Sequence, residues 1–342
     1  MPFFKMNKQK MMFVGLIFSF IISHGYSQTT LNKQNIENTL NDAFNKFKDL
    51  KEGKNADYIK ELANVDPNIF GIALVTADGA VYTKGDITSM VSIQSISKVF
   101  TMAKVIEQEG PQFLQEKIGV NATGLPFNSI VAVEMHKGDK INPLVNPGAI
   151  ATTSLIRGND SVAKWKDIQK IQSDFAGRQL SMNRPVYISE ASDNLRNQAI
   201  AHLLLAYNRI YFDPVQSTDL YTKQCALNVN VKDLATMAAT LANGGVNPVT
   251  KKKVVSQSTV MYTLPVMATA GLYDNSGIWL FNSGLPAKSG VGGGILAVCP
   301  GKFGIAVISP PLDESGNSLK AQKVIQYVVE KLKANPYWIE PK

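Results

Sequence analysis

Apolar residues recur along the chain either at helical spacing or in short strand-like runs, and the pattern first changes from one to the other near the N-terminus. Residues 31–65 carry apolar side chains at helical spacing, which predicts an amphipathic opening helix. Residues 69–76 and 80–83 are short apolar runs typical of strands. Between them, Asp78-Gly79 supplies the positive-φ residues of a tight turn. The first part of the chain is therefore predicted to be a helix followed by a β-hairpin.

The second change of period encloses a long helical stretch. From residue 95 to about 268 the spacing is mostly helical, and a helix over 231–243 ends at Gly244-Gly245 with Pro248 beyond. Strand-like runs return at 285–290, 295–300 and 304–310, and a helix with one apolar face follows at 318–334. We therefore predict an α+β fold: an antiparallel sheet built from both chain ends, flanked by helices, with a helical subdomain at about 101–268.

The first 27 residues have the layout of a secretory signal peptide. Lysines stand at positions 5, 8 and 10, an apolar run covers 11–22, and small residues precede a cut after Ser27. The apolar run is shorter than the roughly 20 residues that span a bilayer. We expect residues 1–27 to be removed, the chain to be exported to the periplasm or the medium, and residues 28–342 to form a single domain.

Composition and charge narrow the classes of function. Hydrophobic residues make up 45% of the 342 residues, which excludes a disordered chain. The formal charge of +8 falls to 8 − 3 = +5 when the three lysines of the signal peptide leave, and no basic stripe remains. We therefore predict no nucleic-acid partner, and no membrane partner after cleavage. Cys225 and Cys299 have no metal-ligand spacing, and although export would permit a disulfide, their apolar surroundings favour two buried thiols.

Few histidines are left for catalysis. The mature chain keeps only His136 and His202. His136 is expected in a loop, and His202 is expected to lie on an apolar helix with its side chain packed in the core. A Ser-His-Asp triad, a zinc site and a Cys-His dyad are all poorly supported by two such residues. If the protein is an enzyme, its base is predicted to be another residue type, and no metal is expected.

A serine and a lysine at helical spacing offer that base. Ser95 and Lys98 stand one turn apart at the start of a predicted helix, so the amine can reach the hydroxyl. Burial would favour the neutral amine that a general base needs. The same spacing occurs at Ser161 and Lys164, in a polar stretch expected at the surface, and Ser95 taken alone could be an ordinary helix N-cap.

A second element strengthens the case for Ser95 as a nucleophile. Lys288-Ser289-Gly290 matches the strand motif that accompanies Ser-x-x-Lys nucleophiles in penicillin-recognising enzymes. The glycine-rich run at 291–294 follows, where missing side chains permit close backbone approach to a ligand. A backbone N–H there, opposite that of Ser95, would form an oxyanion hole.

These motifs, with several others in the same order, resemble the serine-dependent glutaminases, which share the fold of serine β-lactamases and penicillin-binding proteins. The resemblance runs from about Tyr58 to residue 335. It is carried by segments 94–98, 142–150, 189–197, 241–245, 284–291 and 309–318. It implies hydrolysis of L-glutamine to L-glutamate and ammonia without a cofactor, by a catalytic domain over 28–342 that forms a homodimer or homotetramer.

The resemblance also implies roles for single residues. Ser95 would be the nucleophile, Lys98 its activator, Tyr273 a proton shuttle to the leaving ammonia, and the Val291 N–H an oxyanion donor. The residues expected to bind the substrate, including its α-carboxylate and α-amino group, are Tyr58, Asn146, Glu190, Asn197, Tyr221, Tyr273 and Val291.

Two other functions stay open on the sequence. Ser192-Asp193-Asn194 spells the third motif of β-lactamases and penicillin-binding enzymes, so a serine acyltransferase of that type is one alternative. A non-catalytic exported amino-acid-binding protein is the other. Pro147 departs from the alanine usual in the glutaminases and follows the proposed carboxylate ligand Asn146, which raises the question of how the loop there is shaped.

Overall fold

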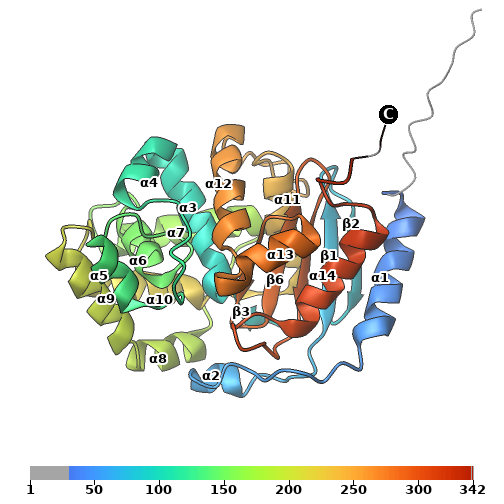
Figure 1. The fold of residues 1–342 in the computed structure, drawn as a ribbon, viewed down its shortest axis with the longest axis horizontal. Coiled ribbons are helices and arrows are strands. Elements are labelled where there is room, and N and C mark those ends of the chain that lie inside the picture. The colour runs from blue at the N-terminus through green and yellow to red at the C-terminus, as the bar shows by residue number, and fades with distance from the viewer. Residues whose placement is uncertain (1–30, 340, 342) are drawn as a thin grey trace, which may run out of the picture.

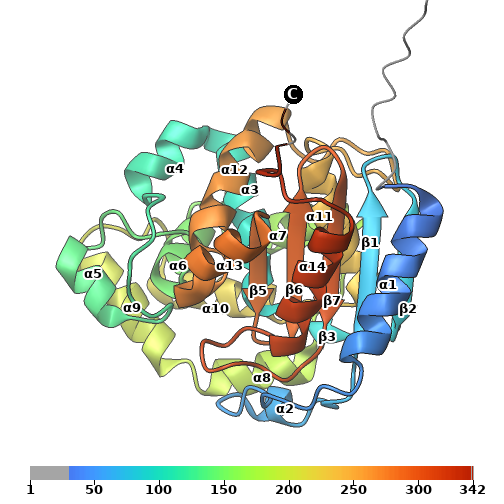
Figure 2. The same ribbon diagram turned by 45° about the vertical axis from the view of Figure 1, so that its right-hand side comes forward.

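A five-stranded antiparallel sheet forms one half of the molecule (Figures 1 and 2). Our description rests on a computed structural model and covers residues 31–339 and 341, so the predicted signal peptide lies outside the described residues. The strand order is β2-β1-β7-β6-β5. The strands are β1 (Gly71–Thr76), β2 (Val81–Gly85), β5 (Ala287–Gly290), β6 (Gly294–Cys299) and β7 (Phe303–Ile308).

Both ends of the described chain contribute to this sheet, as predicted. The hairpin β1–β2 comes from the N-terminal part, and its turn contains Gly79 at a φ of 103°. The three C-terminal strands join the hairpin where β1 pairs with β7, with Gly71 opposite Ile308. Because these partners are distant in sequence, the sheet closes only when both chain ends are in place.

Each face of the sheet is covered by helices (Figures 1 and 2). On one side lie α1 (Lys33–Phe47), α13 (Ser276–Ser283) and α14 (Leu319–Lys331), which contribute to one apolar core with the sheet. On the other side lies α11 (Val231–Ala242), whose start is fixed by a capping box between Asn230 and Asp233. A side chain at Gly304 of β7 would meet the α11 backbone at 2.1 Å from the Ala239 nitrogen, so helix and strand are in direct contact.

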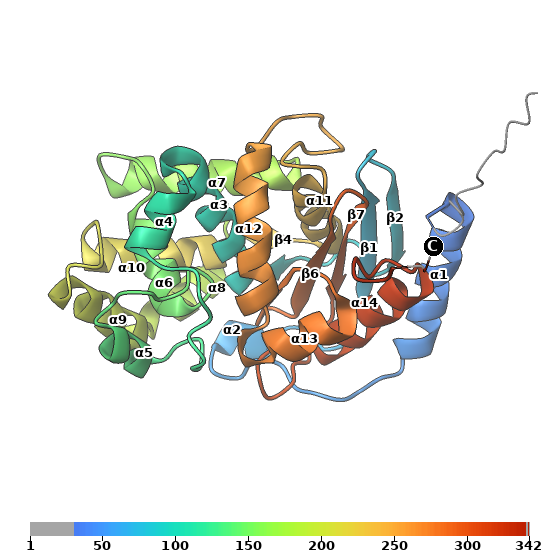
Figure 3. The ribbon, with the colours of Figure 1, turned by 45° about the horizontal axis from the view of Figure 1, so that its top comes forward.

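The other half of the molecule is helical, and α12 crosses between the halves (Figure 3). The helical half and the antiparallel sheet beside it confirm the predicted α+β fold. The elements of the helical half are α3 (Ser97–Glu109), α4 (Pro111–Lys117), α5 (Ile130–His136), α6 (Asn146–Ser154), α7 (Ser161–Ala176), α8 (Arg184–Ser192), α9 (Leu195–Ala206), α10 (Pro214–Cys225) and α12 (Gln257–Ala270). The connecting segments include α2 (Lys60–Ala63), β3 (Val91–Ser92), β4 (Asn228–Val229) and two 3-10 turns, η1 (Gln94–Ile96) and η2 (Tyr273–Asn275).

Several local predictions were wrong. The opening helix stops at Phe47, well before residue 65. His202 is exposed on α9 rather than packed, and its Nδ1 lies 2.8 Å from the Gln198 carbonyl oxygen. His136 is the last residue of α5 rather than part of a loop. Lys164 is only 5% exposed, because its amine satisfies carbonyl oxygens at the end of α6.

Two further findings concern thiols and membranes. Cys225 and Cys299 are both buried and free, as predicted.

Within the part of the chain that the structure describes, none of the helices has the length and apolar character needed to cross a bilayer.

Candidate active site

The predicted nucleophile Ser95 lies where the two halves of the molecule meet. It belongs to η1, which packs against β5 and β6 of the sheet and against α3 and α10 of the helical half. The α-helix itself begins two residues later at Ser97, whose hydroxyl donates to the Gln94 carbonyl oxygen at 2.7 Å. Ser95 makes no capping hydrogen bond, so its hydroxyl is not committed to holding the helix start.

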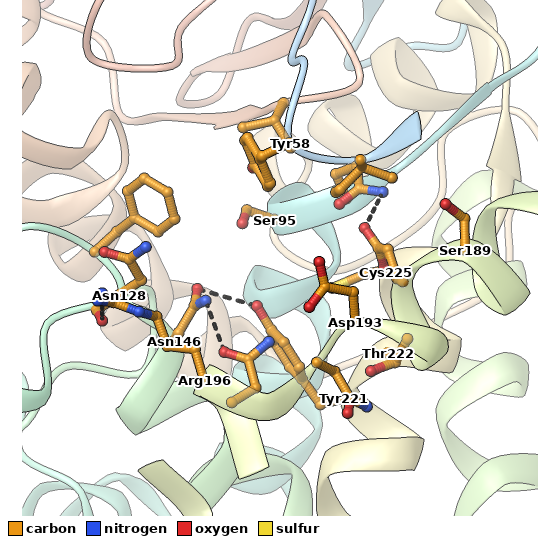
Figure 4. A pocket seen from close by; sticks show the side chains of 17 residues that line it. Tyr58, Ser95, Asn128, Asn146, Ser189, Asp193, Arg196, Tyr221, Thr222 and Cys225 are labelled. Atoms are coloured by element: carbon orange, nitrogen blue, oxygen red, sulfur yellow. Dashed lines mark hydrogen bonds between the residues drawn. The ribbon is translucent and has the colours of Figure 1, made fainter. Parts of the chain in front are cut away.

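A cavity opens in front of Ser95 (Figure 4). Figure 4 shows Ser95 between Tyr58 on one side and Asn146 with Tyr221 on the other. Seven of the nine predicted site residues line this cavity. They are Tyr58, Ser95, Asn146, Glu190, Asn197, Tyr221 and Val291, drawn from segments spread over most of the chain.

Lys98 lies directly beneath that cavity and is joined to it through Asn146. Its amine donates to Asn146 Oδ1 at 2.7 Å, and the same oxygen accepts from the Tyr221 hydroxyl at 3.1 Å. Asn146 Nδ2 in turn donates to Asn197 Oδ1 at 3.2 Å. Four predicted residues therefore form one hydrogen-bonded network, which fixes the direction in which the Asn146 amide faces.

The surroundings of Lys98 favour its neutral form. The side chain is 1% exposed and forms no ion pair with an acid anywhere in residues 31–339. Burial lowers the pKa of the amine to about 8, with Cys225 nearby opposing the shift. A substantial fraction of the molecules therefore carries a free amine at mildly alkaline pH, as a general base requires.

Glu190 is the ionisable acid that faces this cavity from α8. Burial raises the pKa of its carboxyl to about 7, while a hydrogen bond from Gln94 Nε2 at 2.9 Å acts in the opposite direction. Gln94 is held in the left-handed region, with a φ of 53°, and its amide also donates to the Ser92 hydroxyl at 3.1 Å. A half-buried carboxylate with so little compensation is poised to pair with a cationic ligand group.

The glycine-rich turn after β5 approaches the nucleophile segment as closely as the sequence predicted. A side chain at Gly290 would lie 2.7 Å from the Ile93 carbonyl oxygen, and one at Gly292 would lie 2.3 Å from the Ser92 oxygen. Val291 between them lines the cavity, and its N–H makes no hydrogen bond with any other residue that the structure describes. That N–H is available to a ligand oxygen.

Tyr273, also a predicted site residue, does not line this cavity but lines a second one, and Phe127 contributes to both. Tyr273 has a left-handed φ of 53°, is 7% exposed, and contacts Phe127 with ring centroids 4.6 Å apart. Burial raises the pKa of its hydroxyl to about 12, an effect that the nearby Ser95 and Ser289 hydroxyls oppose. The hydroxyl itself satisfies no hydrogen bond with the described part of the protein.

The loop around Pro147 accommodates this proline without distortion. Asn146 and Pro147 open α6, and the first turn of a helix tolerates proline because its N–H has no intrahelical acceptor there. Gly148 allows the helix to touch the preceding loop, since a side chain would meet the Asn142 carbonyl oxygen at 2.0 Å. The departure at Pro147 therefore leaves Asn146 in place.

The sequence did not single out several residues that line the cavity. Gln94 precedes Ser95 and enters the sequence analysis only within segment 94–98, because its contact with Glu190, 96 residues away, leaves no local signal. Others come from loops and helix ends without a chemical pattern: Ile59, Phe127, Asn128, Ser189, Asp193, Asn194, Arg196, Thr222 and Cys225. Two of them, Asp193 and Asn194, belong to the triplet that resembled a β-lactamase motif.

Metal chemistry has no obvious ligand set here. Across residues 31–339 and 341, no three His, Cys, Asp or Glu side chains are grouped so that they could hold a metal ion.

An antiparallel sheet with a helical half beside it, and a buried Ser-x-x-Lys pair at their junction, define a β-lactamase-like protein. A sequence model of the glutaminase family matches residues 53–337. The chain belongs to the glutaminase family.

Individual relatives agree over nearly the whole chain. A glutaminase of Colwellia psychrerythraea is 55% identical over 300 residues, which cover 88% of this chain and 96% of the relative. A glutaminase of Escherichia coli is 47% identical, with 90% and 99% covered.

Solved structures of glutaminases have the same fold. The probable glutaminase ybaS superposes with a TM-score of 0.89 at 47% identity, covering 90% of this chain and 99% of that one. A probable glutaminase from Bacillus subtilis, solved with 6-diazo-5-oxo-L-norleucine, gives a TM-score of 0.81 at 26% identity, with 90% and 99% covered.

Proposed function

We propose that this protein hydrolyses L-glutamine to L-glutamate and ammonia through an acyl-enzyme formed on Ser95. The hydrolysis follows from membership of the glutaminase family. The acyl-enzyme rests on one observation above all: Ser95, which makes no capping hydrogen bond, lines a cavity, and the buried Lys98, whose pKa is lowered, donates to Asn146 of the same cavity. No cofactor is required by this chemistry.

Recognition would use both charged groups of the substrate, its α-ammonium and its α-carboxylate. Glu190 would pair with the α-ammonium, because a carboxylate withdrawn from solvent gains from a cation. Asn146 would donate an amide N–H to the α-carboxylate, with its oxygen already occupied by Lys98 and Tyr221. Asn197, Tyr221 and Tyr58 would complete the enclosure. A ligand lacking either charge would leave a buried polar group unpaired, which is strongly disfavoured.

Catalysis would then proceed in two steps. Ser95 Oγ attacks the side-chain amide carbon while its proton passes to the neutral Lys98 amine. The backbone N–H groups of Ser95 and Val291 stabilise the tetrahedral oxyanion, and a proton delivered through Tyr273 lets ammonia leave. Water attacks the acyl-enzyme in the second step, releases glutamate and restores Ser95.

Purified enzyme tests this assignment directly. Ser95→Ala should abolish glutamate release, whereas Ser161→Ala, in the second Ser-x-x-Lys copy away from the cavity, should leave it unchanged. Equal rates for wild type and Ser95→Ala would contradict the proposal. Turnover of a chromogenic β-lactam without glutamine turnover would favour the acyltransferase alternative. Thermal stabilisation by glutamine without ammonia release would favour a binding protein.

We further propose export of the mature chain and its assembly into a homodimer or homotetramer. The basic and apolar pattern of residues 1–27 supports export, and residues 28–342 remain our proposed catalytic domain, with its helical subdomain at about 101–268. Ile278 and Phe281 on α13 are 61% and 86% exposed, which supports a subunit contact. Mass spectrometry of the secreted protein and sedimentation analysis test the two proposals separately.

A further inference from the structure

Lys288 is a fully buried lysine to which the proposed chemistry gives no task. It stands in β5 with 0% exposure and is absent from the cavity wall. Its amine donates to the carbonyl oxygens of Gly271 and Ser289, at 2.8 Å each, and lies 4.2 Å from the centroid of the Tyr273 ring. Its contacts therefore centre on the segment that carries Tyr273.

That segment is attached to β5 at several points. Gly271 lies so close to the strand that a side chain there would meet the Ala287 oxygen at 1.8 Å. The Gly271 carbonyl oxygen also accepts from the Ser289 N–H at 3.2 Å, in addition to the Lys288 amine. The backbone two residues before Tyr273 is thus held by a backbone donor and a side-chain donor from the same strand.

The Tyr273 side chain needs such support because its hydroxyl lies near the Ser95 and Ser289 hydroxyls without a well-formed hydrogen bond to either. Its hydroxyl has no hydrogen-bond partner among residues 31–339, so the ring is positioned by its left-handed backbone and by contacts to its faces and edges. Phe127 supplies one such contact at 4.6 Å between ring centroids, and the Lys288 amine supplies another at 4.2 Å. These two contacts restrict the orientation of the ring.

Stability alone does not account for a lysine at this position. Burying an amine without a carboxylate partner is costly, and a well-packed apolar side chain of similar length would avoid that cost. Burial, and then the charge of Lys98, lower the pKa of Lys288 well below its ordinary value, which shows how unfavourable the charged form is here. An expensive side chain next to a reactive tyrosine indicates a role in the reaction.

We propose that Lys288 is a positioning residue for Tyr273: it holds the ring and the Gly271–Tyr273 turn so that the phenol oxygen faces Ser95. This inference rests on the proposed function, in which Tyr273 delivers the proton to the leaving ammonia. Lys288 itself touches neither substrate nor the reacting atoms.

A double-mutant cycle tests the proposal. Lys288→Met should lower kcat by about 10–100-fold, since small misplacements of a reacting group cost that much, with KM changed less than about twofold. In a Tyr273→Phe background the same substitution should change kcat by less than about threefold, because the positioned hydroxyl is already absent. A full additive loss in that background, or a loss confined to KM, would overturn the proposal.

Lys164 provides a matched control. It is 5% exposed, donates to the Ser154 and Ile156 carbonyl oxygens, and lies 4.7 Å from the Phe212 ring, yet it does not line the cavity. Lys164→Met should therefore leave kcat unchanged even where it alters the melting temperature. An equal fall in kcat in both variants would mean that losing any buried lysine impairs the enzyme, and would contradict a specific role for Lys288.

The outcomes also separate this inference from the proposed function. If Tyr273→Phe leaves kcat unchanged, Tyr273 is not the proton donor and the proposed function itself needs revision. If Tyr273→Phe is impaired but Lys288→Met is not, only the positioning role is wrong. Should Lys288→Met fail to fold, Lys288→Gln retains a donor for the Gly271 carbonyl oxygen and can be taken through the same cycle with the same criteria.

Discussion

Two side chains with opposite pKa shifts, the buried Lys98 and the half-buried Glu190, set the pH behaviour of the site. The pKa of Glu190 is raised to about 7 and that of Lys98 is lowered to about 8. Glu190 must be ionised to pair with the α-ammonium, and Lys98 must be neutral to accept the serine proton. We expect KM for glutamine to rise as the pH falls below about 7, and kcat to increase as it rises through about 8. A KM that does not rise below about pH 7 would contradict the role of Glu190, and a kcat that stays flat through about pH 8 would contradict that of Lys98.

The same shift at Glu190 has a consequence for stability. Its carboxyl has a pKa of about 7 in the folded protein against an ordinary 4.5, so the folded state binds the proton more tightly than the unfolded state. Ionised Glu190 therefore destabilises the fold above that range, and the cost disappears as the pH falls toward the ordinary pKa. Glu190→Gln should raise the free energy of unfolding by about 1–3 kcal/mol near pH 8 while abolishing activity.

Chemical unfolding at two pH values checks this prediction. The advantage of Glu190→Gln over wild type should shrink as the pH is lowered toward 4.5, the ordinary pKa of the carboxyl. Glu134→Gln on the exposed side of α5 is a suitable control, since within residues 31–339 the Glu134 carboxylate accepts a hydrogen bond only from the Tyr207 hydroxyl. A destabilised Glu190→Gln variant at alkaline pH would show that the carboxylate is better compensated than its surroundings suggest.

Sequence reasoning succeeded at single residues where chemistry and spacing coincide, and failed where tertiary contacts decide. Ser95 and Lys98 were recognisable because they stand one helical turn apart before an apolar helix. His202 was misplaced because α9 buries only Ile200, Ala201 and Leu204, so an apolar neighbourhood in sequence did not mean burial. Long-range contacts such as Gln94 with Glu190, 96 residues apart, leave no local pattern.

At the scale of elements, the glycine turn after β5 decides how the sheet meets the nucleophile. Gly292→Ala would place a methyl group 2.3 Å from the Ser92 carbonyl oxygen. This clash involves backbone atoms, so a side-chain rotation cannot relieve it. The turn would have to move, and the Val291 N–H would move with it. We expect kcat to fall by about 10²-fold, comparable to the loss of one oxyanion donor.

Steady-state kinetics with a second glycine variant isolates this effect. Gly277 lies at the exposed start of α13, and a side chain there would meet no atom within 4 Å. Gly277→Ala should leave kcat unchanged. An unimpaired Gly292→Ala variant would indicate that the close approach of the turn is dispensable for the reaction.

Most elements were predictable because their periods are clear, and their ends were less so. The strand predicted at 304–310 is observed at Phe303–Ile308, and the closing helix predicted at 318–334 is Leu319–Lys331. The 3-10 turn at Gln94–Ile96 was not anticipated, since it depends on packing against β5 and α10 rather than on local preference.

At the scale of the whole molecule, one sheet made from both chain ends ties stability to contacts far from the cavity. Leu40 of α1 is 2% exposed and belongs to the core between α1, α14 and the sheet. Leu40→Ala should lower the free energy of unfolding by about 2–5 kcal/mol through the cavity it creates. Because α1 contributes nothing to the cavity wall, kcat per folded molecule should be retained.

Denaturant titration together with activity at a permissive temperature checks this separation. Loss of kcat in a fully folded Leu40→Ala sample would mean that the outer helices also shape the site. The α+β architecture was predictable because strands and helices are segregated along the sequence. The position of the cavity at the junction was not, because it depends on how the two halves pack.

Rapid acid quench of the enzyme during glutamine turnover, followed by mass spectrometry of its peptides, tests the central claim most directly. The account predicts that the peptide containing Ser95 gains the mass of one γ-glutamyl group, and that Ser95→Ala gains none. Steady glutamine hydrolysis by Ser95→Ala, or an adduct found only on another residue, would contradict the proposed chemistry.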